Sequence, residues 1–328
     1  MSISQKRLAE TLGVSVATVS RVLNGKENVS PETRARVESL LRDSQYSPDL
    51  LARSLKTRRT HTIGILVPDI TEVFFGAVIK SAVRFLETAG YDTLLCDSDE
   101  NIRRERAYLD SLAGKRVEGI LIASLGGECD DVRGTFGKTI GRGIPIVQID
   151  NYVTTDCGAV LIENRRAGAM GIRHLYERGC RNIAVIAGST REYTGRERLA
   201  GCREEAAKLG LELRVREGDF KERSGYDAMR SLLGEQPRPD AVFIHSSKMS
   251  YGAVAALRDA GLRYPDDLLV LTFDIRDVYG TCQPTLSSVV QPEAKIGALA
   301  AENLLAALDG EPARTVFLEP ELLLRESC

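Results

Sequence analysis

From residue 62 onward, short apolar runs alternate with longer amphipathic segments, and this alternation restricts the fold more than any other feature of the chain. Continuously apolar runs are typical of parallel strands that are buried on both faces. The segments between them carry apolar residues at helical spacing. We therefore predict an α/β fold with doubly wound parallel sheets. The predicted strands are 63–67, 92–96, 119–123, 145–149, 182–187, 241–245 and 268–273, and the predicted helices are 73–89, 102–115, 164–178, 196–209, 224–233 and 248–260.

The N-terminal part of the chain has a different pattern. Residues 13–24 are typical of the turn and second helix of a helix-turn-helix. Gly13 permits the positive φ that a tight turn requires, and the Ser15 hydroxyl can accept a hydrogen bond from an amide of the first helical turn. Asn24 and Gly25 can end the helix, because both tolerate the left-handed region. We therefore expect an all-α headpiece before the α/β body.

The predicted second helix has one apolar and one polar face. Val19, Val22 and Leu23 recur at helical spacing and can face a small core. The outward residues near its N-terminus, the end that a recognition helix presents to base edges, are Val16, Ala17, Ser20 and Arg21. A short helix over 4–12 precedes it, and Ser30-Pro31-Glu32 has the composition of a third helix's start.

Composition adds limits on partners and compartment. At 328 residues the chain is too long for a single ordinary core. Residues 1–61 hold eleven Lys and Arg against six Asp and Glu, whereas the whole chain has a net charge of −2, so a polyanion would contact the headpiece rather than the body. Seven scattered Cys and three His show no metal-ligand spacing, and we expect no metal or cofactor. The N-terminus lacks a signal peptide and no apolar run could span a bilayer, so we expect a cytoplasmic protein.

These motifs resemble a known family. Gly13-Val14-Ser15 followed by 18–24 (Thr-Val-Ser-Arg-Val-Leu-Asn) is similar to the headpiece signature of the lactose-repressor (LacI/GalR) family of bacterial transcription regulators. The resemblance continues in 51–56, which is similar to the family's hinge helix, and in 63–69 (Ile-Gly-Ile-Leu-Val-Pro-Asp), and it covers essentially the whole chain.

The resemblance implies a headpiece, a hinge helix and two lobes like those of a periplasmic sugar-binding protein. It also implies that the chain returns to the first lobe near 289–292, so that a helix over 293–308 belongs to that lobe. The expected domains are a headpiece at 1–47, a hinge and linker at 48–61, an N-terminal lobe at 62–161 plus 291–318, and a C-terminal lobe at 162–290 plus 319–328.

By resemblance, a homodimer binds a double-stranded, roughly palindromic operator. Val16 and Ala17 suit thymine methyls, and Arg21 suits either guanine or a phosphate. Leu55 would enter the minor groove as an apolar wedge, or else contact the body as part of an amphipathic linker. The candidate DNA-binding residues are Ser4, Ser15, Val16, Ala17, Thr18, Ser20, Arg21, Asn24, Arg53, Ser54, Leu55 and Lys56.

A small effector, a sugar or sugar derivative, is expected between the lobes, beyond the C-terminal ends of the strands. The candidate effector-binding residues are Asp69, Phe74, Ser124, Asp150, Arg196, Phe220, His245, Ser246, Asp274 and Gln291. The two Asp other than Asp274 could instead cap helices, the two Phe could be core residues, and Arg196 could form a surface ion pair.

The chain departs from the family pattern at Ser246-Ser247, where the family has an Asn-Asp pair, and at Asp274-Ile275-Arg276, where it often has two adjacent acids. With His245 and Lys248 nearby, the departures suggest an effector with an anionic group, such as a sugar phosphate or sugar acid.

Two other classes of function stay open. A sugar-modifying enzyme could use the same fold, although residues 68–72 lack the glycines of a dinucleotide site, and the common P-loop, zinc-protease and esterase motifs are missing. A solute-binding module would fit the body but not the basic headpiece. The C-terminus carries no heptad repeat, so a tetramerising coiled coil is not expected.

Overall fold

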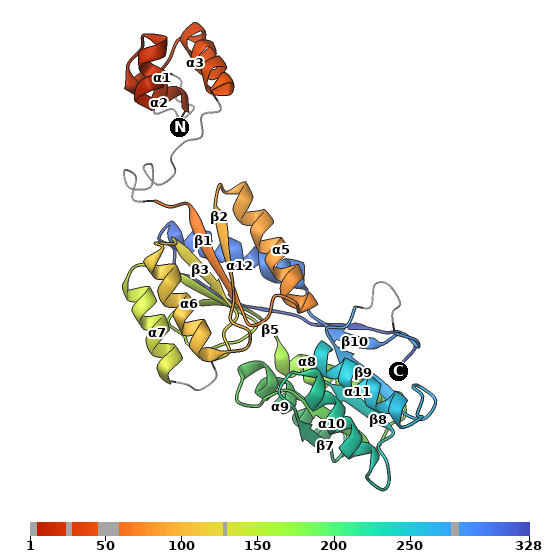
Figure 1. The fold of residues 1–328 in the computed structure, drawn as a ribbon. Coiled ribbons are helices and arrows are strands. Elements are labelled where there is room, and N and C mark those ends of the chain that lie inside the picture. Colours follow the sequence, from red (N-terminus) through yellow and green to blue (C-terminus); the bar gives the residue numbers. More distant parts are fainter. Residues whose placement is uncertain (1–4, 24–27, 45–58, 127–129, 277–281) are drawn as a thin grey trace. The chain divides into compact units, whose positions relative to one another are not determined.

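The computed structural model describes residues 5–23, 28–44, 59–126, 130–276 and 282–328. The chain forms two compact units, Met1–Thr60 and His61–Cys328, which we call the headpiece and the body and describe separately (Figure 1). The predicted contacts at Ser4, Asn24 and 53–56 lie outside the described residues.

Three helices form the described part of the headpiece: α1 (Gln5–Leu12), α2 (Val16–Leu23) and α3 (Pro31–Asp43). Their small core consists of Leu8, Ala9, Val19, Val22 and Val37, all less than 9% exposed. The turn between α1 and α2 depends on Gly13, whose φ of 65° is a conformation that side chains with a Cβ rarely adopt. Ser30 caps α3, since its hydroxyl accepts a hydrogen bond from the Thr33 amide at 3.3 Å.

The first lobe of the body contains a six-stranded sheet in the order β11-β5-β4-β3-β1-β2, with every neighbouring pair parallel. Its strands are β1 (Thr62–Val67), β2 (Asp92–Asp97), β3 (Gly119–Ile122), β4 (Ile146–Ile149), β5 (Gly158–Ile162) and β11 (Thr315–Leu318). Alternate residues of β1 enter two cores: Ile63 and Ile65 pack with α5 (Val73–Thr88) and α12 (Glu293–Leu308), and Leu66 packs with α6 (Ile102–Gly114) and α7 (Asp130–Gly141).

The second lobe repeats this architecture, with its sheet in the order β12-β10-β9-β8-β6-β7. Its strands are β6 (Ile183–Ala187), β7 (Arg214–Glu217), β8 (Ala241–Ile244), β9 (Leu269–Phe273), β10 (Ser287–Val290) and β12 (Glu321–Leu323). All pairs are parallel except β10 with β12. Two helix pairs cover its faces: α8 (Asn164–Glu177) with α9 (Tyr193–Lys208), and α10 (Glu222–Leu233) with α11 (Ser247–Asp259). Gly201 of α9 permits the close approach to α8, because a Cβ there would overlap the Arg165 carbonyl oxygen.

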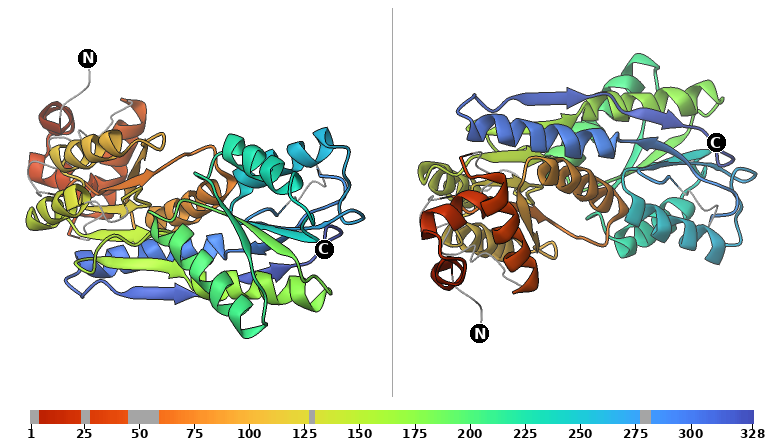
Figure 2. Two further views of the ribbon diagram at one scale, coloured as in Figure 1. Left: turned by 90° about the horizontal axis from the view of Figure 1, so that it is seen from below. Right: turned by 90° about the horizontal axis from the view of Figure 1, so that it is seen from above.

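The chain passes between the two sheets three times, after β5, after β10 and after β11. In each sheet the strands at these crossings occupy the same edge, β11 and β5 in the first and β12 and β10 in the second, as the views of Figure 2 make visible. The opposite edge of each sheet contains β1 and β2 in the first lobe and β8, β6 and β7 in the second. None of these strands stands directly at a crossing between the lobes.

The predicted α/β class with two doubly wound sheets and an all-α headpiece is confirmed. Five strands and one helix were not predicted. They are β5, β7, β10, β11, β12 and α7. Among the described residues, no helix has both the length and the apolar character needed to cross a membrane.

Candidate functional site

Two surfaces of the protein carry the candidate residues, one in each compact unit. In the headpiece, α2 presents Val16 at 44% exposure together with the exposed Ala17 and Arg21. The Ser15 hydroxyl accepts a hydrogen bond from the Thr18 amide at 3.1 Å and therefore caps the helix start. The side chains that face the core of the headpiece are on the opposite side of the same helix, so the exposed stripe can contact a partner without loss of packing.

In the body, a cavity of about 240 Å³ lies between the two lobes. Its walls come mainly from the C-terminal ends of strands and the starts of the following helices, which is the usual ligand position in open α/β sheets. The residues from the first lobe are Pro68, Glu72, Phe74, Phe75, Glu100, Ala123, Ser124, Leu125, Asp150 and Asn151. Those from the second are Ser189, Glu192, Thr194, Arg198, Asp219, Phe220, Lys221, Ser246, Ser247 and Asp274, with Gln291 at a crossing between the lobes.

A single buried cation, Arg198, organises the inner part of the cavity. Its Nε donates to Asn164 Oδ1 at 2.8 Å and its Nη1 donates to the His245 carbonyl oxygen at 3.0 Å. The guanidinium also lies 3.7 Å from the centre of the Phe273 ring. Its Nη2 reaches Asp150 Oδ1 at 3.9 Å, so one side chain links α8, β8, β9 and the end of β4.

Four carboxylates that line the cavity are partly buried. Burial raises the pKa of Glu192 to about 7 and the pKa of Asp274 to about 7. Burial also raises the pKa of Glu72 and of Asp150, against the opposing effects of a Ser247 hydrogen bond and of the Arg198 charge. The cavity lining therefore has more acid groups than cations, which are Arg198 and Lys221, and part of this excess is relieved by protonation.

Unusual backbone conformations hold three of the lining residues in place. Asp150, Phe220 and Asp274 have φ values of 64°, 67° and 57°. Residues without glycine's freedom adopt this region at a cost, and such strain gathers at binding sites. The Phe220 ring packs directly on Gly188 at the end of β6, where any Cβ would overlap the ring.

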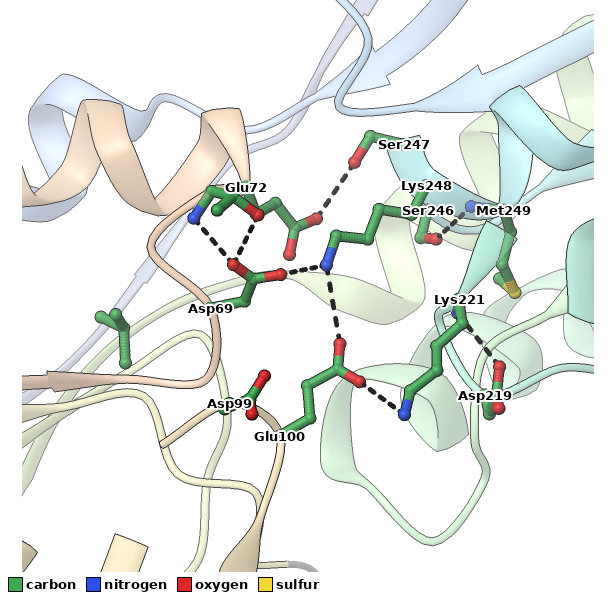
Figure 3. A network of polar contacts seen from close by, with 12 residues as sticks. Asp69, Glu72, Asp99, Glu100, Asp219, Lys221, Ser246, Ser247, Lys248 and Met249 are labelled. Atoms are coloured by element: carbon green, nitrogen blue, oxygen red, sulfur yellow. Dashed lines mark hydrogen bonds and ion pairs between the residues drawn. The ribbon is translucent and has the colours of Figure 1, made fainter. Parts of the chain in front are cut away.

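Polar contacts between the lobes surround the cavity. Asn151 follows β4 of the first lobe, and its Nδ2 donates to Glu192 Oε2 at 3.1 Å while its Oδ1 accepts from the Thr194 amide at 3.2 Å. On the other side, the Ser247 hydroxyl donates to Glu72 Oε1 at 3.0 Å (Figure 3). Lys248 of the second lobe contacts Asp69 of the first, as Figure 3 also shows.

Seven of the ten predicted effector residues line the cavity, namely Phe74, Ser124, Asp150, Phe220, Ser246, Asp274 and Gln291. The other three lie elsewhere. Asp69 pairs with Lys248 outside the lining. His245 is fully buried behind Arg198, with its Nε2 3.4 Å from Cys202 Sγ. The Arg196 side chain is 41% exposed and pairs with Glu197, because α9 begins at Tyr193 and directs Arg198, not Arg196, inward.

The predicted anion-attracting groups are not available to a ligand. Lys248 is engaged by Asp69 and lies 3.7 Å from Glu100 Oε1. Arg276 donates to both oxygens of Glu293 at 2.7 and 2.8 Å. Burial lowers the pKa of His245 to about 3, so its ring is neutral at physiological pH. In the structure these three groups are paired or neutral, so they do not support the argument for an anionic effector, which stays a prediction.

Sequence reasoning missed the residues that contribute most to the cavity's electrostatics and to its contacts between lobes. These are Glu72, Asn151, Glu192 and Arg198. One signal was available: Arg198 lies four residues after Thr194 and next to Leu199, so a helix that started at residue 193 would have placed it on the buried face.

Known proteins resemble both units. A family profile described as "Bacterial regulatory proteins, lacI family" matches residues 6–49, and one described as "Periplasmic binding protein-like domain" matches residues 172–328. The HTH-type transcriptional repressor PurR of Edwardsiella ictaluri is 36% identical over 98% of this chain and 96% of its own length. PurR of Proteus mirabilis is 35% identical over the same shares of both chains.

Solved structures share the fold of the whole chain. The lac repressor dimer bound to operator and the anti-inducer ONPF shares the fold, with a TM-score of 0.88 at 23% identity over 100% of this chain and 99% of that one. A complex of the transcriptional regulator CelR with cellobiose has a TM-score of 0.75 at 31% identity over 99% of this chain and 100% of that one. The chain therefore belongs to the LacI family of bacterial transcriptional regulators, which are DNA-binding repressors and not enzymes.

Proposed function

We propose that this repressor's affinity for its operator is controlled by a small, neutral, hydroxyl-rich effector held in the cavity between the lobes. The observation that carries this proposal is the excess of partly buried carboxylates around one buried guanidinium, Arg198. Carboxylate oxygens accept hydrogen bonds, so they suit a ligand that offers many donors, as a sugar does. An anionic ligand would have to enter a cavity that already carries too much negative charge.

A polar atom left without a partner supports a ligand at this place. Gln291 is 1% exposed, and its Nε2 donates to Asp274 Oδ2 at 2.7 Å, whereas its Oε1 has no hydrogen-bond partner among the residues that the structure describes. A buried acceptor of this kind costs about 1–3 kcal/mol unless a donor reaches it. A ligand hydroxyl in the cavity would supply that donor. The cellobiose carried by CelR shows that a relative at 31% identity binds a sugar.

The size of the cavity restricts the effector. A volume of about 240 Å³ is below the roughly 300–1,000 Å³ usual for drug-sized ligands. The rings of Phe74 and Phe220 can contact the C–H faces of a sugar, while the strand-end side chains contact its hydroxyls. We therefore propose an effector close to one sugar ring in size.

For DNA binding we propose that a homodimer places α2 of each headpiece in the major groove, in the cytoplasm where the chromosome lies. The exposed Val16 and Ala17 would contact thymine methyls, and Arg21 would contact guanine or a phosphate. Leu55, which lies outside the described residues, would enter the minor groove from the hinge. We also propose the domain boundaries predicted from the sequence, with the headpiece at 1–47, the hinge and linker at 48–61 and the two lobes after them.

Two experiments test the two parts. Isothermal titration of the full chain with matched sets of neutral sugars, sugar acids and sugar phosphates should detect binding only for neutral compounds, and binding of sugar phosphates alone would overturn the effector proposal. Selection of bound fragments from genomic DNA should recover a near-palindrome that the Leu55→Ala variant recovers poorly. A palindrome recovered equally by Leu55→Ala would remove the hinge from the mechanism.

A further inference from the structure

Four charged residues connect the lobes beside the cavity, and we call them the lobe bridge: Asp69, Glu100, Lys221 and Lys248. Lys248 Nζ contacts Asp69 Oδ2 and lies 3.7 Å from Glu100 Oε1, while Lys221 Nζ lies 3.0 Å from Glu100 Oε2 (Figure 3). Both acids belong to the first lobe and both lysines to the second. Each lysine therefore bonds across the gap between the lobes.

The bridge lies at the rim of the cavity. Glu100 and Lys221 line the cavity itself, and the side chains of Asp69, Glu100 and Lys248 are 18%, 24% and 25% exposed. Partial burial makes the pairs of Lys248 stronger than surface pairs while leaving them accessible to salt, whereas the Lys221 side chain is 57% exposed and its pair is weaker. Hydrogen bonds from Lys248 and Thr71 lower the pKa of Asp69 although its burial opposes this, so the pair with Lys248 stays charged.

The bridge is placed where lobe opening would move residues furthest. The three covalent crossings join the β11–β5 edge of one sheet to the β12–β10 edge of the other. The bridge residues follow or flank β1, β2, β7 and β8, toward the other edge of each sheet. Four strand spacings separate β5 from β2, which is about 19 Å. A rotation of about 10° around the crossings would then shift the bridge by about 3 Å, enough to break ion pairs of this length.

We propose that the lobe bridge holds the lobes closed before effector binds, so that Lys221 and Lys248 are positioning residues that set how often the cavity opens. They keep the carboxylates of the first lobe next to Arg198 of the second. Lys248 then acts on the other lobe and not on the ligand. For the effector-controlled function proposed above, the lobe bridge would make effector entry depend on ionic strength. It would also set the fraction of molecules with open lobes before the effector binds. The closure itself does not rest on that function.

One backbone amide reports on closure without any ligand. Thr194 is 3% exposed and stands in the first turn of α9, where amides have no partner within the helix. Its amide donates to Asn151 Oδ1 of the other lobe at 3.2 Å. Hydrogen exchange at Thr194 therefore requires the lobes to separate, whereas exchange in the central strand β8 requires unfolding of the lobe.

The test is hydrogen exchange of the full-length protein without ligand or DNA, at 50 and 500 mM NaCl. We expect Lys248→Met to speed exchange at Thr194 by about tenfold, with Lys221→Met giving a smaller increase. Asp69→Asn keeps an oxygen for the Thr71 amide but loses the charge, and it should match Lys248→Met. The double variant Asp69→Asn with Lys248→Met removes both ends of one pair and should exchange no faster than either single variant. Wild type at high salt should move toward the variants.

The control is Lys295→Met, which removes the same charge at an exposed position of α12. It should leave exchange at Thr194 unchanged, and exchange in β8 should be equal in all variants. Three results would each overturn the proposal. They are exchange at Thr194 within twofold of wild type in Lys248→Met, an effect of the double variant equal to the product of its two single effects, and exchange that does not change with salt. Because no effector is present, these outcomes are separate from failure of the effector titration.

Discussion

Replacing Arg198 with Met tests whether this buried cation holds the two lobes' strand ends in place. The substitution would leave Asn164 Oδ1 and the His245 carbonyl oxygen without their donors and Asp150 without its counter-charge. Met occupies a similar length and stays flexible, so the loss comes from polar groups and not from an empty volume. Removing one partner from a buried charge pair costs about 3–5 kcal/mol.

One effect moves the expected loss toward the lower end of this range. Without Arg198, burial would raise the pKa of Asp150 and Asp274 further, and protonation would relieve part of the cost. We therefore expect the free energy of unfolding to fall by about 3 kcal/mol. Urea denaturation followed by far-UV circular dichroism measures this change, provided that the slope with urea is unchanged.

Arg196→Met is the matched control two residues away. Its side chain is 41% exposed and its pair with Glu197 spans 3.4 Å, so we expect a change of less than about 0.5 kcal/mol. A loss below about 1 kcal/mol in Arg198→Met, or an equal loss in both variants, would refute the assignment of Arg198 as the organising residue of the cavity.

Further predictions concern pH, the headpiece and DNA. Because burial raises the pKa of Glu192 and of Asp274 to about 7, the folded protein holds protons that the unfolded chain has lost, so the free energy of unfolding should fall as pH rises from about 5 to 8. Glu192→Gln with Asp274→Asn should flatten this dependence by about 1–3 kcal/mol in pH-dependent denaturation, and an unchanged slope would contradict it. Val19→Ala, at a fully buried position of the headpiece core, should abolish operator binding in a mobility-shift assay while the body's denaturation curve stays as in wild type. Arg21→Ala should weaken operator binding by about 1–3 kcal/mol in fluorescence anisotropy, and Arg42→Ala, also exposed but on α3, should change it less.

The sequence predicted the fold well wherever strands are buried on both faces. The run at 63–67 is continuously apolar because β1 lies between two helical layers, and the observed strand is Thr62–Val67. β7 was missed because Arg214 and Arg216 alternate with Val215 at an exposed edge of the second sheet. α7 was missed because three glycines interrupt its weak apolar pattern.

The candidate site was predicted where it depends on strand ends, and not where it depends on pairing. Asp150 and Asp274 follow buried strands, so topology alone places them at the cavity. The choice between Arg196 and Arg198 depends on the residue at which α9 begins, and local sequence leaves that uncertain by a few residues. The role of Lys248 depends on Asp69, which is 179 residues away in the chain and on the other lobe.

The measurement that tests the central claim most directly is operator affinity with and without effector. Fluorescence anisotropy of the full-length protein on its selected operator should change at least about fivefold when a neutral sugar that binds is present at saturation. Asp274→Asn should bind the operator as wild type does without ligand but lose most of that response. If the sugar saturates the wild-type protein and leaves operator affinity unchanged, the cavity between the lobes does not control DNA binding and the account is wrong.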